Sequence, residues 1–394
     1  MSTRPSAGRW SDVDLVITSL EAWDGVWRRN QHLVAGLLRR DADLRVLFVE
    51  PATDPLHAAL GAGQPRLGRG LRQSPPVDGI RPEALWLLEP TKWLPRRVDR
   101  RVDERWARQV LRATRSMGMT EPLLWVNDPT GSLLVEATPW PSLYDVTDDW
   151  TLAERAAAET DRIVAQEHVL LARCEEVVVC SPALAASKGA DRDVTLVPNG
   201  VDTAAYRVVR DRPTDLPDGR CAVYVGTLHG DRLDLDLCAA TARALAGSGH
   251  LVLVGPDALV PEQRGRLEAA GVVLLGARPS TDVPAYVLHA DVLVVPHVVT
   301  PFTDSLDPIK LYEYQASGRP VVSTPVAGFR DVDDPLVTVA GQETFTAAVV
   351  GLLSTGEGPT AAVDPERAAG ADWSRRVDQL VDVLGRLRDR DRRA

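Results

Sequence analysis

Short apolar runs alternate with amphipathic segments along most of the chain. Between the runs at 13–19 and 44–49, residues 26–40 place Trp27, Leu33, Val34, Leu37 and Leu38 on one helical stripe. Alternating strands and helices predict βαβ units and a parallel sheet covered on both faces. The apolar runs that predict strands in this first stretch are 13–19, 44–49, 123–126, 142–146 and 176–180.

The stretch 197–219 interrupts this alternation. Residues 197–202 read Val-Pro-Asn-Gly-Val-Asp, and Pro213, Pro217 and Gly219 follow among six charged residues between 207 and 218. Such a composition predicts turns and a domain boundary near 200–220. Beyond it we expect strands at 221–225, 250–254, 272–275, 292–296 and 321–323 and helices at 233–246, 261–270, 283–289 and 308–317. The pattern therefore predicts an α/β protein with two Rossmann-like domains.

Composition and charge exclude several classes of protein. The 394 residues carry a net charge of −10, which argues against nucleic-acid binding. The four cysteines lack the spacing of a zinc site, and the first twenty residues lack the apolar core of a signal peptide. No apolar run reaches the ~18 residues of a membrane span. Gly-rich GxGxxG and P-loop patterns are absent after the first strand of either domain, which disfavours a dehydrogenase or an ATPase.

Charge and tryptophan are unevenly distributed along the chain. Residues 1–120 hold 20 basic and 14 acidic side chains, whereas residues 121–394 hold 25 and 41. Two interpretations of the basic part stay open: a solvated surface, or a peripheral contact with an anionic membrane. Nine of the ten tryptophans precede residue 151. The two halves are therefore expected to do different jobs.

The segment 301–325 contains the clearest candidate site. Asp307 is the expected N-cap of a helix over 308–317, with Pro308 at its first position and Gly318 at its C-terminal stop. The helix follows a buried strand, so it begins at the carboxyl edge of the sheet, where ligands bind in open α/β folds. Lys310 in the first turn is unfavourable for the helix dipole unless an anion is bound there. A surface pair between Lys310 and Glu313 is the alternative.

The segment Pro-Ile-Lys-Leu-Tyr-Glu-Tyr-Gln-Ala-Ser-Gly-Arg-Pro-Val-Val at 308–322 resembles the donor-binding helix of nucleotide-sugar-dependent glycosyltransferases with the GT-B architecture. The resemblance is to the family-4-like group that includes teichuronic-acid-type transferases. Matching motifs occur in the expected order at 23–32, 144–150, 197–202, 224–228 and 276–279. The resemblance covers roughly residues 13–380. It implies an acceptor-binding domain at 1–200, a donor-binding domain at 201–372, and a C-terminal helix at 373–394 that packs back toward the first domain.

The resemblance also assigns roles to residues. The diphosphate of the donor would contact Lys310 and backbone N–H groups near Ser305 and Leu306, beside Gly226, Thr227 and Arg232. Glu313 would bind the ribose, and Ala277 and Arg278 the base. The catalytic candidates are Asp148, Asp149 and Lys310. The acceptor would meet Trp23, Trp27, Arg29, Asp128 and Trp150.

The implied reaction moves a sugar from a UDP-, GDP- or dTDP-linked donor to a hydroxyl of a glycan, a lipid-linked sugar or a small natural product. We expect a hexosyltransferase-type enzyme that retains the anomeric configuration and uses neither a metal nor a cofactor. The expected location is the cytoplasm, where the inner face of the membrane is within reach. Ser305 stands where relatives carry a glutamate that touches the sugar, so a nucleotide-sugar epimerase and a non-catalytic nucleotide-sugar-binding protein stay open as alternatives.

Overall fold

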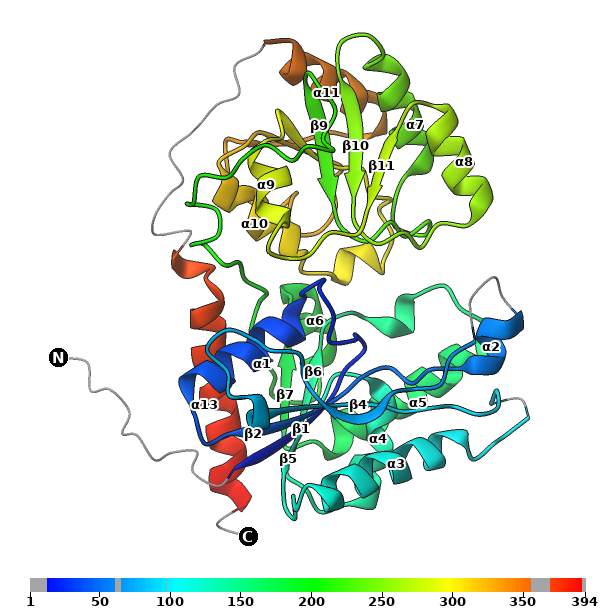
Figure 1. Ribbon diagram of the computed structural model, residues 1–394, viewed down its shortest axis with the longest axis vertical. Helices are drawn as coiled ribbons and strands as arrows, with labels where there is room; N and C mark the ends of the chain where they lie inside the picture. Colours follow the sequence, from blue (N-terminus) through cyan, green and yellow to red (C-terminus); the bar gives the residue numbers. More distant parts are fainter. Residues whose placement is uncertain (1–12, 61–64, 97, 356–368, 392–394) are drawn as a thin grey trace, which may run out of the picture. The chain divides into compact units, whose positions relative to one another are not determined.

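The computed structural model describes residues 13–60, 65–96, 98–355 and 369–391, which form two compact α/β units (Figure 1). The first unit is built from the described residues up to Asp24, from Arg28–Val197 and from the residues after Arg375. The second comprises Gly25–Trp27 and Pro198–Arg375. The chain passes from one unit to the other at Val197, the first residue of the predicted turn.

The first unit contains an eight-stranded sheet. Its strand order is β3-β4-β2-β1-β5-β6-β7-β8, and every neighbouring pair is parallel except β3 with β4. The central strand β1 pairs Val16 with both Leu47 and Leu124. The strands are β1 (Asp14–Thr18), β2 (Arg45–Val49), β3 (Gly70–Gln73), β4 (Leu85–Glu89), β5 (Leu123–Val126), β6 (Ser142–Val146), β7 (Glu176–Val179) and β8 (Thr195–Leu196).

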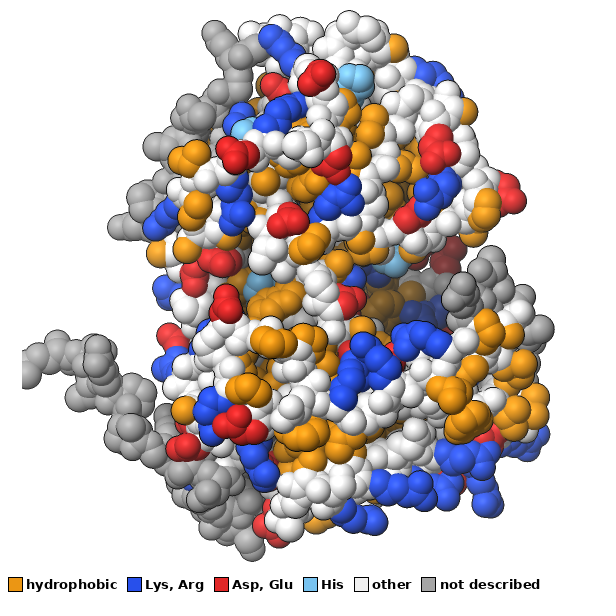
Figure 2. Space-filling view, in the orientation of Figure 1, with side chains coloured by type: hydrophobic (Ala, Val, Ile, Leu, Met, Phe, Trp, Pro, Cys, Tyr) orange, Lys and Arg blue, Asp and Glu red, His pale blue; other side chains and the backbone are white. Residues whose placement is uncertain are grey.

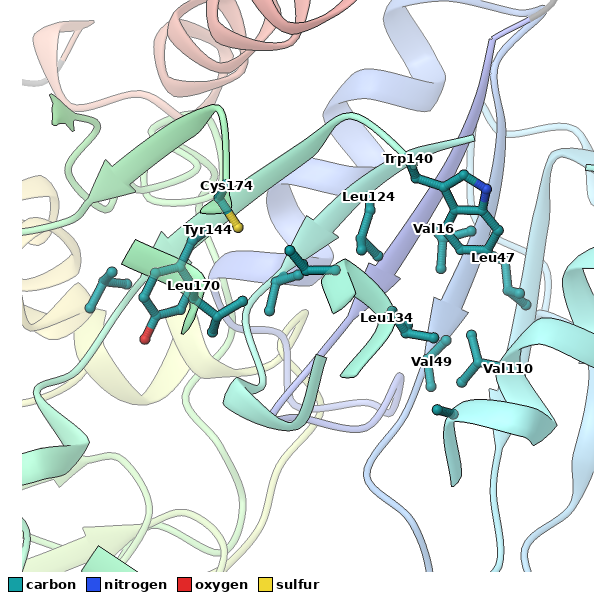
Figure 3. Packing of buried hydrophobic residues seen from close by; sticks show 14 of the residues in the cluster. Val16, Leu47, Val49, Val110, Leu124, Leu134, Trp140, Tyr144, Leu170 and Cys174 are labelled. Carbon is teal, nitrogen blue, oxygen red and sulfur yellow. The ribbon is translucent and has the colours of Figure 1, made fainter. Parts of the chain in front are cut away.

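Helices cover this sheet because each buries one apolar stripe. Its helices are α1 (Arg29–Arg40), α2 (Pro55–Leu60), α3 (Val102–Ser116), α4 (Ser132–Ala137), α5 (Ala157–Arg173), α6 (Pro182–Lys188) and the larger part of α13 (Trp373–Asp391), with short 3₁₀ turns η1 (Pro82–Ala84), η2 (Pro129–Gly131) and η3 (Trp150–Leu152). Figure 3 shows one core layer of this unit, in which strand residues such as Val16 and Leu124 pack against Val110, Leu134 and Leu170. Helix α13 is tied to the sheet by Arg386, whose Nη2 lies 2.9 Å from Glu176 Oε2.

The second unit contains a six-stranded, fully parallel sheet in the order β11-β10-β9-β12-β13-β14. One apolar cluster contains residues of α9 and α10, and another contains residues of α7, α8 and α11. The strands are β9 (Cys221–Val225), β10 (His250–Val254), β11 (Val273–Gly276), β12 (Val292–Val295), β13 (Val321–Ser323) and β14 (Val337–Val339). The helices are α7 (Leu235–Ala244), α8 (Pro261–Ala269), α9 (Val283–Leu288), η4 (Thr303–Ser305), α10 (Ile309–Ser317) and α11 (Gln342–Thr355).

Candidate functional site

The second unit has its topological switch point between β9 and β12. Strand β10 follows β9 on one side, whereas β12 pairs with β9 on the other, so the loops after β9 and β12 diverge there. Ligands of open α/β sheets bind at such points. The loop after β9 supplies Gly226 and Thr227, the loop after β12 supplies His297, and helix α10 supplies Lys310 and Glu313. The topology therefore brings predicted donor-binding residues from distant segments to one sheet edge.

Helix α10 begins one residue later than predicted. Pro308 is its N-cap and makes no side-chain capping bond, and Gly318 ends the helix in the left-handed conformation with a φ of 65°. The prediction that Asp307 caps the helix was wrong. Its carboxylate instead accepts a hydrogen bond from the backbone N–H of Asn199 at 2.6 Å and another from the Tyr312 hydroxyl at 2.8 Å. Asp307 thus holds the turn at 197–202 against the start of α10.

Lys310 lies over the face of an aromatic ring. Its Nζ is 5.2 Å from the centroid of Tyr224, the fourth residue of β9. The Tyr224 hydroxyl is in turn 3.0 Å from Nε2 of His297, which is buried. Burial, followed by the positive charges of Lys310 and Arg232, lowers the pKa of His297 well below its usual value. The imidazole is therefore neutral at pH 7 and adds no charge beside Lys310.

Positive charge at this edge is only partly balanced. Burial, with the nearby guanidinium of Arg232, lowers the pKa of Lys310 to about 8, against the opposing pull of Glu313. Arg232 stacks on Phe302, its Cζ 4.9 Å from the ring centroid. The buried Nε of Arg232 has no hydrogen-bond partner among the described residues. Buried polar groups are normally hydrogen-bonded, so this N–H indicates an acceptor that the protein itself does not provide.

Gly226 lies so close to Tyr224 and Lys310 that no side chain fits at this position. Its φ is 151°, and a Cβ on it would lie 2.8 Å from the Tyr224 hydroxyl and 3.4 Å from Cε of Lys310. The preceding residue, Val225, donates its backbone N–H to the hydroxyl of Tyr314 at 3.0 Å. Tyr314 is fully buried on α10, so it fixes the end of β9 relative to the helix. Glycine is therefore required at residue 226, both by this close packing and by the positive φ.

Glu313 lies one turn after Lys310, and its carboxylate also interacts with the hydroxyl of Tyr206. Burial raises the pKa of Glu313, while Lys310 and a hydrogen bond from Tyr206 oppose that rise. The geometry matches the predicted shared face of Lys310 and Glu313. The ribose contact that the resemblance implies for Glu313 stays a prediction, and Tyr206 is the neighbour that orients the carboxylate.

Ser305 and Leu306 precede the helix, but Ser305 is engaged within its own turn. Both its backbone N–H and its hydroxyl donate to the carbonyl of Phe302, at 3.1 and 2.7 Å. Its side chain is buried. The backbone N–H of Ser305 could contact a diphosphate only if this turn opened. The predicted diphosphate contact therefore requires a larger rearrangement at Ser305 than at Leu306.

The predicted base-binding loop follows β11. Ala277 is exposed, and the side chain of Arg278 is fixed by three oxygen acceptors. Arg278 Nη1 donates to the Ala277 carbonyl at 2.8 Å, Nε donates to the Tyr286 hydroxyl at 2.9 Å, and Nη2 pairs with Asp215. Tyr286 also donates to Asp215 at 2.8 Å. Asp215 and Tyr286 are structural partners of this loop that sequence patterns did not single out.

The first unit has a buried polar network at its own switch point, between β1 and β5. Arg29 and Asp145 form an ion pair at 3.0 Å with exposed fractions of 5% and 0%, and Trp125 Nε1 donates to the same carboxylate at 3.2 Å. Asn30 donates to Asn127 at 2.8 Å and also to Ser19 at 2.9 Å. Arg29, which was predicted to bind the acceptor, is held in this ion pair, and its acceptor contact stays a prediction.

The remaining acceptor-side candidates differ in their surroundings. Asp149 is buried, pairs with Lys188 at 3.0 Å and caps η3 through the N–H of Thr151 at 3.2 Å. Asp148 is partly buried and accepts a hydrogen bond from the Thr147 hydroxyl at 3.1 Å. Asp128 caps η2 through the N–H of Thr130 at 2.9 Å. Of the two acidic catalytic candidates, Asp149 is the one that the structure places in a buried ion pair with a lysine.

The tryptophans divide between core and surface. Trp23, expected in an acceptor cleft, is 6% exposed and packs edge-on to Phe48 with ring centroids 5.1 Å apart. Trp106 and Trp125 are buried. Trp27 and Trp150 are partly buried, and Arg155 stacks on Trp150 at 4.9 Å. Trp10 lies outside the described residues. Trp27 and Trp150 are therefore more accessible to an acceptor than Trp23.

The described residues contain neither a cluster of metal-ligating side chains nor a membrane-spanning helix. Over residues 13–60, 65–96, 98–355 and 369–391, no three His, Cys, Asp or Glu side chains gather as metal ligands would. In the same ranges, no helix combines the length and the apolar character that crossing a membrane requires.

Sequence comparisons agree with the donor-side geometry. Residues 219–355, which contain the β9–β12 switch point and α10, match the family model described as "Glycosyl transferases group 1". TuaH of Bacillus subtilis (strain 168), whose name assigns it to teichuronic acid biosynthesis as a glycosyltransferase, is 26% identical over 232 residues. The alignment covers 54% of this chain and 58% of TuaH, so the chain spans less than two thirds of that relative.

Solved structures extend the likeness over both units. Sucrose-phosphate synthase from Thermosynechococcus elongatus superposes with a TM-score of 0.71 at 17% identity, covering 95% of this chain and 99% of that one. HepE from Anabaena, in complex with UDP and glucose, gives 0.66 at 14% identity, covering 94% and 98%. At these identities the likeness shows the fold. The GT-B fold and the resemblance to family-4-like glycosyltransferases, both expected from the motifs, are confirmed.

Proposed function

We propose that this chain, whose second unit carries the group 1 glycosyltransferase pattern, transfers a sugar from a nucleoside-diphosphate donor to an acceptor hydroxyl. The second unit would bind the donor, and the first unit the acceptor. The observation that carries the proposal is the buried Nε of Arg232, which lacks a partner, beside a lysine whose pKa is lowered to about 8. Two incompletely balanced cations at a sheet edge suit the diphosphate of such a donor.

The chemistry follows from the charge that develops on the leaving group. As the glycosidic bond breaks, negative charge grows on the nucleoside diphosphate, and fixed cations stabilise it. Lys310 and Arg232 are held in place by Tyr224 and Phe302 respectively, so they need not reorganise during the reaction. Gly226, which has no side chain, would let the backbone approach the phosphates, as the resemblance implies. Lys310 and Arg232 would thus stabilise the negative charge of the leaving nucleoside diphosphate.

Finer features of the reaction are part of the same proposal. Because protein cations face the leaving group, we propose transfer without a metal, and we propose retention of the anomeric configuration on the resemblance alone. Asp148 would act as base or sugar anchor. The acceptor would be a glycan, a lipid-linked sugar or a small molecule. Activity that survives EDTA and a product anomer matching the donor, seen by NMR, are the expected results.

One incubation separates this proposal from its alternatives. The protein is mixed with UDP-, GDP- and dTDP-sugars, and both free nucleotide and sugar identity are followed. Slow nucleotide release, quickened by a suitable acceptor, supports a transferase. A changed sugar without release would indicate an epimerase. Binding with neither change would indicate a non-catalytic protein. Ser305 favours that outcome, because it replaces a sugar-binding glutamate and its hydroxyl already donates to the Phe302 carbonyl.

A further inference from the structure

Three segments of the first unit that are distant in sequence meet at the carboxyl edge of its sheet. The backbone N–H of Thr53 donates to the Pro90 carbonyl at 2.9 Å, and that of Lys92 donates to the Thr53 carbonyl at 2.8 Å. The N–H of Gly68 donates to the Thr91 hydroxyl at 2.9 Å. These bonds join the segments 53–56, 66–69 and 89–94 into one continuous surface.

Each of these segments exposes a large apolar side chain. Trp93 is 63% exposed and Leu67 is 53% exposed, and Leu56 and Leu94 are also exposed. Figure 2 shows apolar side chains gathered on this side of the first unit, flanked by Lys and Arg side chains. Large apolar residues that are brought together on a surface usually mark an interaction site. We call Leu56, Leu67, Trp93 and Leu94 the apolar patch.

The segments of the apolar patch also carry cations, and Glu89, the carboxylate that pairs with two of them, is buried. Arg66 and Arg69 are more than half exposed, yet each reaches Glu89, at 2.6 and 2.8 Å. Glu89 is only 4% exposed, so its charge faces inward while the arginines face solvent. Burial alone would raise the pKa of Glu89, but the hydrogen bonds from Arg66 and Arg69 outweigh it and lower the pKa to about 2, so the carboxylate stays charged. Lys92, which precedes Trp93, is a third basic residue, partly buried and with a pKa that burial lowers.

We propose that the apolar patch and the cations of its segments dock the first unit on an anionic lipid bilayer. Tryptophan prefers the interface between lipid headgroups and acyl chains, and exposed leucines insert beside it. Each lysine or arginine near an anionic leaflet adds about 1 kcal/mol of attraction. A chain with a net charge of −10 would otherwise be repelled by such a surface, so the attraction has to be local. The inference goes beyond the proposed transfer reaction and does not depend on it.

The test uses the full chain and vesicles of defined composition. Co-sedimentation is measured with phosphatidylcholine vesicles and with vesicles containing phosphatidylglycerol, at low and high salt. We expect binding to the anionic vesicles alone, weakened by salt. The double variant Trp93→Ser/Leu94→Ser should bind about tenfold more weakly, because two apolar side chains no longer insert.

A matched control removes apolar surface elsewhere. Val208 and Val209 are exposed in the second unit, so Val208→Ser/Val209→Ser should bind vesicles like the wild type. Nucleoside-diphosphate binding by both variants, measured without lipid, should equal that of the wild type and shows that each is folded. The proposal is overturned if the wild type ignores anionic vesicles at low salt, or if Trp93→Ser/Leu94→Ser binds them unchanged. Failure of donor binding in the wild type would instead count against the proposed function.

Discussion

The ammonium group of Lys310 rests on the face of Tyr224, with 5.2 Å between Nζ and the ring centroid. This contact joins helix α10 to strand β9 at the switch point of the second unit. The Tyr224 hydroxyl simultaneously meets a buried, neutral His297 at 3.0 Å. An aromatic face stabilises a cation without neutralising it, so Lys310 is held in position with its charge still available to a ligand.

The ring of Tyr224, more than its hydroxyl, should support donor binding. Tyr224→Phe keeps the aromatic face and loses the bond to His297, whereas Tyr224→Leu loses both. We expect Tyr224→Leu to weaken nucleoside-diphosphate binding by about 1–2 kcal/mol, the size of a desolvated cation–π contact. Tyr224→Phe should retain most of the affinity. Calorimetric titration of both variants, with melting temperatures as a folding control, makes the comparison. Equal losses in the two variants would assign the effect to the hydroxyl instead.

Donor affinity should depend on pH through Lys310. Its pKa in the free protein is lowered to about 8, and the lysine is a cation only below that value. A bound diphosphate favours the cation, so affinity should be constant below pH 8 and fall above it, by up to about tenfold per pH unit. Lys310→Arg stays protonated and should flatten the profile. An unchanged slope in Lys310→Arg would show that another group titrates.

Adding one methyl group at Gly226 should block the site. In Gly226→Ala, the Cβ would press on the Tyr224 hydroxyl at 2.8 Å and approach Cε of Lys310 at 3.4 Å, at a φ of 151° that alanine adopts poorly. We expect at least a tenfold loss of donor affinity. Gly265→Ala in helix α8 is the matched control, because its Cβ would meet nothing within 4 Å. That variant should bind normally and gain about 0.5–1 kcal/mol of stability. Similar binding by the two variants would contradict the predicted approach of the donor.

The buried pair of Arg29 and Asp145 should behave as a structural unit. Asp145→Ala leaves a guanidinium buried without its partner, which should lower the free energy of unfolding by about 3–5 kcal/mol. Arg29→Met/Asp145→Leu removes both charges and should lose much less. Urea unfolding of the single and double variants measures the difference. If the losses simply added, the pair would not be coupled, and Arg29 would again be open to an acceptor role.

Sequence patterns predicted most strands and helices because apolar periodicity reports burial directly. The runs at 123–126, 142–146, 221–225, 250–254 and 321–323 match β5, β6, β9, β10 and β13 to the residue. Strands β3, β4, β8 and β14 were missed. Gly70–Gln73 and Thr195–Leu196 are too short and too polar to show a period, and their pairing comes from neighbouring strands.

The site was predictable only where a ligand contact leaves a local signal. Lys310 was visible because a cation in the first turn of a helix is unfavourable unless an anion is bound there, whereas Gly226 was assigned through the family resemblance alone. The contacts of Tyr224, His297 and Tyr206 were not, because they join segments far apart in the sequence. Asp307 illustrates the opposite error. Its position before Pro308 suits an N-cap, yet the turn at 197–202 takes its carboxylate through Asn199.

The most direct test of the central claim is a titration that separates phosphate recognition from base recognition. Uridine, guanosine and thymidine and their diphosphates are titrated into the wild type and into Lys310→Met, whose side chain is similar in length but uncharged. For the preferred base, the diphosphate should bind the wild type at least a hundredfold more tightly than the nucleoside, and Lys310→Met should lose most of that difference. Equal affinities for nucleoside and diphosphate, or an unchanged preference in Lys310→Met, would contradict the assignment of this site.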